Sequence, residues 1–205
     1  MYLIVKLNDY KIMKKIASTG LLLGAFLFGV ASCNQQQGAV EEAQEVNEQR
    51  AEGTAMEDRM VDQSEFMTKA ASNSMLEVEA GRLAQERGQM QEVKDYGQMM
   101  VTDHTNANDQ LRQLAQQKNI TLPDSMGQDH RDQLQNLRDK TGQEFDQQYM
   151  DLMVSSHEDA VSMFEDAANN MQDPDVKNFA STTLPKLREH LDRARQLDER
   201  VGQNQ

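Results

Sequence analysis

Apolar residues recur along most of the chain with the spacing of amphipathic helices. On a helical wheel of about 100° per residue, four long segments each gather their apolar side chains on one face: about 63–87, 90–118, 143–170 and 174–200. Glycine, proline and asparagine interrupt the pattern between these segments. A shorter helix is predicted over about 126–139. The pattern predicts an all-α, antiparallel four-helix bundle with an additional short helix between the second and third long helices.

The apolar period is absent before this region. Residues 34–60 are rich in Gln, Glu, Asn and Ala. So few apolar groups cannot offset the entropy of ordering the chain, and we expect a disordered tether over residues 33–61. The folded domain is expected over residues 62–201.

The N-terminal residues have the layout of a secretory signal. Lys14 and Lys15 precede an apolar or small run over residues 16–31. At roughly 16 residues, this run is shorter than the ~20 needed to span a bilayer, which favours cleavage over an uncleaved membrane helix. Residues 1–32 are therefore predicted to be a signal peptide, with either Met1 or Met13 as its start.

The end of this segment, Val30-Ala31-Ser32-Cys33, resembles the bacterial lipoprotein signal, in which the cysteine thiol carries a diacylglyceryl group. The resemblance implies that Cys33 is lipidated and that the acyl chains attach the mature protein to the membrane. Cys33 is the only cysteine, so no disulfide within the chain competes for it. We expect an outer-membrane lipoprotein of the bacterial cell envelope, facing the periplasm or the surface.

The charge of the chain argues against nucleic acid as a partner. The full sequence carries −13, and residues 1–32 carry four lysines and one aspartate, so their removal takes the charge to −16. A surface of this sign repels phosphate backbones and anionic lipid headgroups. We therefore expect no nucleic-acid partner, while the sequence identifies no protein partner.

Four polar side chains fall on or beside the inward faces of four different helices. Glu77 and His104 are central on the apolar faces of the first and second long segments. His190 lies within the apolar face of the last segment, and His157 lies at the side of the third. Counted from the turn near residue 89, Glu77 and His104 differ in height by only about 5 Å. The pattern permits a site in the middle of the bundle that draws on all four helices.

Two interpretations of these four side chains stay open. Imidazole nitrogens and one carboxylate suit a single transition-metal ion such as zinc, iron or copper. This interpretation makes Glu77, His104, His157 and His190 the metal ligands. Alternatively, the histidines form a buried hydrogen-bonded network with neighbours such as Asp103 or Tyr149 and fix the register of the helices.

Other chemistry finds less support in the sequence. Fourteen methionines raise the alternative of a thioether copper site around Met99-Met100, Met153 and Met163, but methionine more often fills gaps in a core. Asp103-His104 could be an acid–base pair, yet no nucleophile with a defined neighbour accompanies it. We predict no catalytic residues, and the sequence favours a non-enzymatic role without deciding the matter.

Three stretches resemble a bacterial envelope family. They are Val101-Thr102-Asp103-His104, the segment from Phe145-Asp146 to Met153-Val154-Ser155-Ser156-His157, and Leu184-Pro185-Lys186-Leu187-Arg188-Glu189-His190-Leu191. They are similar to the family of domain of unknown function 4142, whose members are often labelled outer membrane proteins and are grouped with ferritin-like bundles. The likeness covers about 62–200. It implies a ferritin-like fold and an envelope address, and it brings no established activity.

The chain departs from the usual ferritin-like metal site. Such proteins often hold two metals with Glu-x-x-His pairs, but Val101, Val154 and Leu187 stand three residues before the inward histidines. A dinuclear carboxylate centre is therefore not expected. Two functions remain: a non-enzymatic envelope bundle with a binding or structural role, and a metal-binding ferritin-like envelope protein that serves metal buffering or stress resistance.

Overall fold

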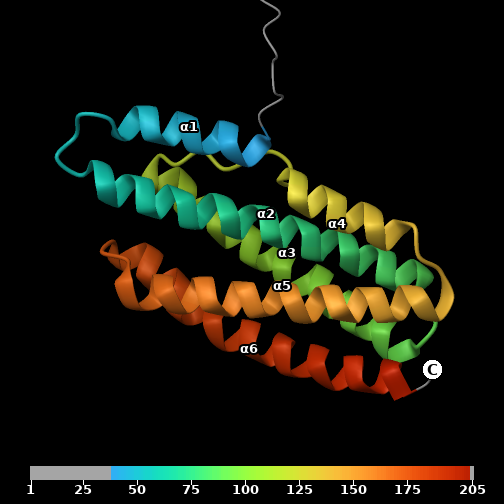
Figure 1. Ribbon diagram of the computed structural model, residues 1–205. Coiled ribbons are helices and arrows are strands. Elements are labelled where there is room, and N and C mark those ends of the chain that lie inside the picture. The colour runs from blue at the N-terminus through green and yellow to red at the C-terminus, as the bar shows by residue number, and fades with distance from the viewer. Residues whose placement is uncertain (1–37, 204–205) are drawn as a thin grey trace, which may run out of the picture. The chain divides into compact units, whose positions relative to one another are not determined.

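The computed structural model describes residues 38–203. These residues form helices only: α1 (Ala39–Ala51), α2 (Glu57–Arg87), α3 (Gln91–Lys118), α4 (Gln128–Arg138), α5 (Gly142–Asn170) and α6 (Pro174–Gln203). The hairpins α2–α3 and α5–α6 pack side by side, and neighbouring long helices run antiparallel (Figure 1). The predicted all-α, antiparallel four-helix bundle is confirmed, including the short helix α4 between the second and third long helices.

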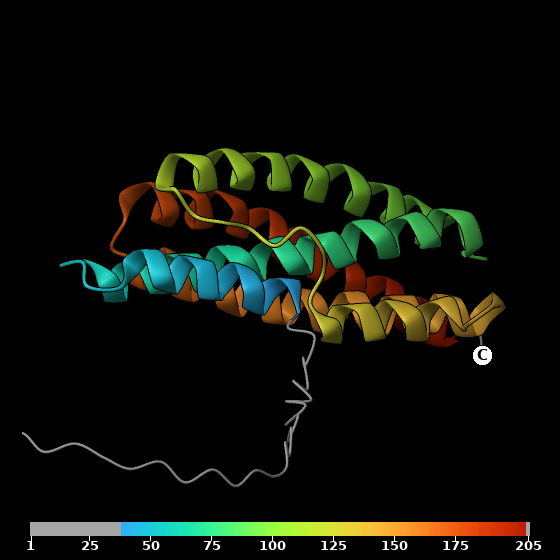
Figure 2. The same cartoon turned by 90° about the horizontal axis from the view of Figure 1, so that it is seen from above.

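The long connection between α3 and α5 sets the directions of the helices. It returns the chain along the length of the bundle through residues 119–127 and α4, so that α3 and α5 run the same way (Figure 2). The α4 helix packs against α2 and α5. Because of this crossover, α2 has α5 as a neighbour and α3 has α6, which allows side chains from all four long helices to meet on the bundle axis.

Two hydrophobic clusters fill the interior of the bundle. Met100, Tyr149 and Leu197 belong to one cluster, while Leu111 and Phe164 belong to the other. Along each long helix, the buried residues of one cluster are separated from those of the other by about one to three turns. The apolar core is therefore divided into two parts, with a layer between them in which other side chains are buried.

Several methionines pack in or against these two hydrophobic clusters. Met100 and Met153 are fully buried in one cluster, and Met99 packs against it. Met163 packs against the other cluster. The methionines named as a thioether copper site are thus divided between the two cores, which agrees with methionine as a filler of irregular space.

The tether predicted over residues 33–61 is wrong for the part that the structure describes. Residues 39–51 form α1, which packs on α2. Its buried side chains are Ala43, Asn47 and Ala51. The Asn47 amide exchanges two hydrogen bonds with the backbone of Thr121, at 2.9 and 2.8 Å. A helix held by two small residues and an amide has no apolar stripe, so hydrophobic periodicity does not reveal it.

The signal segment and Cys33 lie outside the described residues. Within residues 38–203, none of the helices combines the length and the hydropathy that crossing a bilayer requires.

A buried carboxylate fixes the turn between α2 and α3. Gly88 ends α2. The backbone N–H groups of Gln89 and Met90 donate to the carboxylate of Asp146 on α5, at 2.9 to 3.1 Å. These donors belong to the start of α3, where a helix has no internal acceptors. Asp146 therefore joins the first hairpin to the second.

Two glycines let α2 and α3 approach each other closely. A Cβ atom on Gly97 would lie 2.6 Å from the carbonyl oxygen of Gly81 and 2.8 Å from the Cβ of Ala84. A Cβ atom on Gly81 would lie 2.7 Å from the carbonyl oxygen of Gly97. All three contacts are with backbone oxygens or a Cβ atom, which cannot rotate away. The close approach is one turn from Glu77 on α2 and two turns from His104 on α3, so it helps to set their separation.

We predict that Gly97→Ala lowers the free energy of unfolding by about 1–3 kcal/mol, the usual cost of inserting atoms into a packed interface. Urea denaturation of the domain over residues 38–205 measures this change. Gly202→Ala is the matched control, because a Cβ atom there meets nothing closer than 3.9 Å and alanine favours the helix. Equal stabilisation by both substitutions would contradict the close contact.

Candidate metal centre

Three imidazole rings meet in the polar layer between the two hydrophobic clusters. His104 comes from α3, His157 from α5 and His190 from α6. Their ring centroids form a nearly equilateral triangle with sides of 5.5, 5.4 and 5.4 Å. One nitrogen of each ring lies within 4.8 Å of the corresponding nitrogens of the other two. None of the three rings is more than 5% exposed.

A hydrogen-bond acceptor holds the outer nitrogen of each ring. The Nδ1 of His157 lies 2.9 Å from the backbone carbonyl oxygen of Met153. The Nε2 of His190 lies 2.9 Å from a carboxylate oxygen of Asp103 on α3. Carbonyl and carboxylate oxygens only accept hydrogen bonds, so these nitrogens carry the proton in the neutral rings. The lone pair is then on the other nitrogen of each ring.

Glu77 holds the third ring. Its Oε2 lies 2.8 Å from Nδ1 of His104, and its Oε1 lies 3.4 Å from Nδ1 of His157. Oε1 also accepts hydrogen bonds from the Ser156 hydroxyl at 2.7 Å and the Asn73 amide at 3.2 Å. Glu77 is completely buried. Its carboxylate thus lies beside the triangle and contacts the outer nitrogens.

The inner nitrogens have no such acceptor or donor. Nε2 of His104, Nε2 of His157 and Nδ1 of His190 are all buried, and each lacks a hydrogen-bond partner among the described residues. A buried polar atom without a partner costs about 1–3 kcal/mol. Three such atoms in one buried layer are unfavourable unless something else binds them.

The protonation states of the buried groups favour the binding of a cation. Burial lowers the pKa of His190 to about 4, and the nearby His104 and His157 lower it further than Asp103 can raise it. Burial likewise lowers the pKa of His157, against the attraction of Glu77. Burial raises the pKa of the Glu77 carboxyl, but His104, His157 and the Ser156 hydroxyl hold it below its usual range. At neutral pH the layer therefore contains a carboxylate, and His157 and His190 are neutral.

The structure brings together the four residues that helical periodicity placed inward, and it adds others. Ser156 and Asn73 position Glu77. Ser74 contacts His104 through its hydroxyl, which donates to the backbone oxygen of that residue. Polar side chains within the apolar helix faces were the sequence signal for these supports. Their partners are on other helices, so the sequence could not identify them.

Two residues, Asp103 and Tyr149, were proposed as neighbours of the histidines in a hydrogen-bonded network, and only one of them bonds to a histidine. Asp103 does bond to a histidine, His190 on α6. The Tyr149 hydroxyl is buried and has no hydrogen-bond partner within the described part of the chain. A network accounts for the outer nitrogens of the rings and leaves the inner ones unexplained.

His130 lies apart from the triangle. It is half-buried on α4. The Ser72 hydroxyl on α2 lies 2.7 Å from its Nδ1 and accepts the backbone N–H of Gly127. This contact secures the start of α4 on the bundle.

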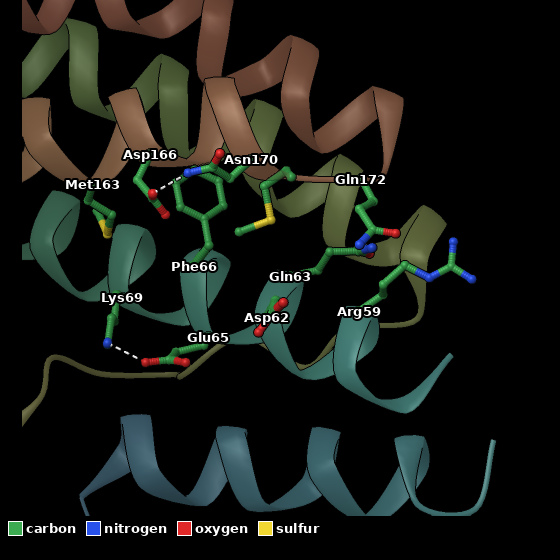
Figure 3. A pocket seen from close by; sticks show the side chains of 11 residues that line it. Arg59, Asp62, Gln63, Glu65, Phe66, Lys69, Met163, Asp166, Asn170 and Gln172 are labelled. Atoms are coloured by element: carbon green, nitrogen blue, oxygen red, sulfur yellow. Dashed lines mark hydrogen bonds and ion pairs between the residues drawn. The ribbon is translucent and has the colours of Figure 1, made fainter. Parts of the chain in front are cut away.

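A surface pocket lies at the end of the bundle opposite the α2–α3 turn. It has a volume of about 300 Å³ and is formed by the start of α2 and the end of α5 (Figure 3). Lys69 pairs with Glu65 there, and Asn170 donates to Asp166 at 2.6 Å. These charged and polar groups satisfy one another, and the pocket does not include the triangle.

Comparisons with known proteins agree with this architecture. A family model described as domain of unknown function DUF4142 matches residues 45–197. A search of curated proteins found no match. Among solved structures, the Cu(II)-bound form of CopM aligns with a TM-score of 0.58 and 17% identity over 67% of this chain and 96% of that chain. A DUF305 fragment from Deinococcus radiodurans aligns with a TM-score of 0.60 and 14% identity over 69% of this chain and 96% of that chain. At these identities the likeness shows a shared helical fold.

We predict that the metal-free protein loses stability as the pH falls from about 6.5 towards 4. An unfolded histidine takes up a proton near pH 6.5, whereas folded His190 does so only near 4. Stability therefore decreases with falling pH in this window, by about 1.4 kcal/mol per pH unit for each such histidine. Thermal melting with EDTA present measures the effect, and His190→Gln should flatten the curve. A melting temperature that stays constant from pH 7 to 5 would contradict the buried neutral rings.

Proposed function

The chain belongs to the DUF4142 family, and we propose that its bundle binds one late first-row transition-metal ion through His104, His157 and His190. The three unpartnered inner nitrogens carry this proposal. Imidazole nitrogen is a good ligand for Cu(II) and Zn(II). The lone pairs converge from three helices, so the site depends on the folded bundle.

The outer hydrogen bonds support a metal site more strongly than a purely structural network. Metal-binding histidines commonly donate their second ring N–H to a carboxylate or a backbone carbonyl, which fixes the tautomer and the orientation of the ring. His104, His157 and His190 each have such an acceptor. A network that only fixes helix register would be expected to use the inner nitrogens as well.

We assign Glu77 a positioning role in place of the ligand role that the sequence suggested. Both of its oxygens face outer nitrogens or hydrogen-bond donors. Its negative charge lies next to the rings and compensates part of the charge of a bound cation in a medium of low dielectric constant.

The donor set favours copper or zinc. Among divalent first-row ions, Cu(II) binds most tightly to a given set of nitrogen ligands. A protein of similar fold, CopM, has a Cu(II)-bound form. Nitrogens on a tetrahedral ion with bonds of about 2.0–2.1 Å lie roughly 3.3 Å apart. One nitrogen of each ring lies within 4.8 Å of a nitrogen of the other two rings, which is compatible with a shared ion.

We further propose that this binding takes place in the bacterial cell envelope, on a protein anchored through lipidated Cys33. The apolar run over residues 16–31 and the small residues before the cysteine support this location. Metal buffering or resistance to metal stress is the role that a buried, single-ion site on an anchored bundle would serve.

The metal proposal is tested with the purified soluble domain, residues 38–205. We expect about one Cu(II) or Zn(II) per chain by elemental analysis after dialysis, and a higher melting temperature because the ion binds only the folded state. His104→Ala, His157→Ala and His190→Ala should each abolish this uptake while circular dichroism still shows helices. Glu77→Gln should keep the site but weaken it by about 10–100-fold.

His130→Ala is the matched control, because His130 is also partly buried but lies outside the triangle. It should bind the metal as the wild type does. Uptake that survives the triangle substitutions, or that is lost with His130→Ala, would refute the assigned site.

The anchor is tested by fractionating cells that express the full chain. Wild type should be in the membrane fraction with an acylated N-terminal peptide by mass spectrometry, because acyl chains supply the affinity. Cys33→Ser should be absent from the membrane fraction, whereas Asn34→Ala, next to the thiol, should remain there. Membrane association of Cys33→Ser would contradict the lipid anchor.

A further inference from the structure

A small cavity adjoins the imidazole triangle. It has a volume of about 40 Å³ and receives residues from α2, α3, α5 and α6. Glu77, His104 and His190 contribute to its wall. It is a separate space from the surface pocket at the start of α2.

Much of the remaining wall of the cavity is apolar. It includes Leu111, Phe164, Phe179 and Leu187, each less than 9% exposed. Half-buried Ala107 on α3 and Thr183 on α6 lie where the cavity approaches the surface. The cavity therefore leads from the gap between α3 and α6 to the triangle.

The triangle supplies three ligands, and two of them, His104 and His190, also line the cavity. Among residues 38–203, no fourth histidine, cysteine or carboxylate joins the three inner nitrogens. Protein sites with three ligands characteristically keep one position for water or an exogenous molecule, whereas closed structural sites use four.

We propose that the bound metal takes a small exogenous ligand from this cavity, of about two or three heavy atoms, such as azide or a diatomic molecule. This inference rests on the proposed metal site. A space of 40 Å³ admits one or a few water-sized groups, and it is far below the roughly 300–1,000 Å³ of pockets for drug-sized molecules. The metal then has one coordination position that the protein does not fill, as in catalytic metal sites.

The charges around the cavity restrict the ligand further. The carboxylates of Glu77 and Asp103 line it, and Lys186 at its edge is already paired with Glu189 at 2.8 Å. A multiply charged anion would be repelled by the carboxylates and would lose its hydration against apolar walls. The favoured ligands are uncharged or carry a single charge.

Azide binding to the Cu(II)-loaded domain tests this inference. Copper content is measured first by elemental analysis. Azide is then titrated, and its charge-transfer absorption and the change in the electron paramagnetic resonance spectrum report binding to copper. We expect a saturable spectrum from the wild type.

Two substitutions close the cavity from opposite sides. Ala107→Leu and Thr183→Leu should each weaken azide binding at least tenfold while copper stoichiometry and helix content stay unchanged. Either variant suffices if the other does not fold. Ala168→Leu is the matched control, because Ala168 is a half-buried α5 residue outside the cavity wall, and it should bind azide as the wild type does.

The outcomes separate the two proposals. One copper per chain without any azide spectrum overturns the open position and leaves the metal site intact. Azide binding that is unaffected by both closing substitutions overturns the role of the cavity. A wild-type domain that takes up no metal overturns both proposals.

Discussion

The burial of a carboxylate and three imidazoles in the middle of an apolar bundle is the constraint on which the rest of the structure depends. Charged and polar groups removed from water must find partners, since each unsatisfied one costs a substantial part of the net stability of a domain. Oε1 of Glu77 meets this requirement through the Ser156 hydroxyl and the Asn73 amide, and Oε2 lies 2.8 Å from Nδ1 of His104. The inner ring nitrogens do not, and a metal ion would satisfy all three at once.

The layer also explains how the core is built. Hydrophobic clusters lie on either side of it and hold the helices at a fixed height. The contact between Gly81 and Gly97 sets the spacing of α2 and α3, and Asp146 joins the two hairpins at one end. Apolar packing alone tolerates small shifts of one helix along another, whereas hydrogen bonds between helices do not. The polar layer thus gives the bundle its register.

The helices that were predicted from apolar periodicity are present in the structure. The disordered tether that was predicted from the lack of periodicity is not, because residues 39–51 form α1. The long helices and α4 follow from apolar spacing and from residues such as Gly88. The α1 helix was missed because Asn47 and two alanines hold it, and the backbone of Thr121 that binds Asn47 is distant in the sequence. Periodicity detects helices that bury a hydrophobic stripe, and α1 has none.

The sequence by itself determined that Glu77, His104 and His190 face inward from separate helices, because the direction of a side chain follows from the 100° step of the helix. Only the tertiary structure decided that the three imidazoles lie at one height, that Glu77 faces their outer nitrogens, and that a cavity adjoins them. The physical reason is that height and rotation between two hairpins depend on packing across interfaces. Local helix geometry contains no information about either.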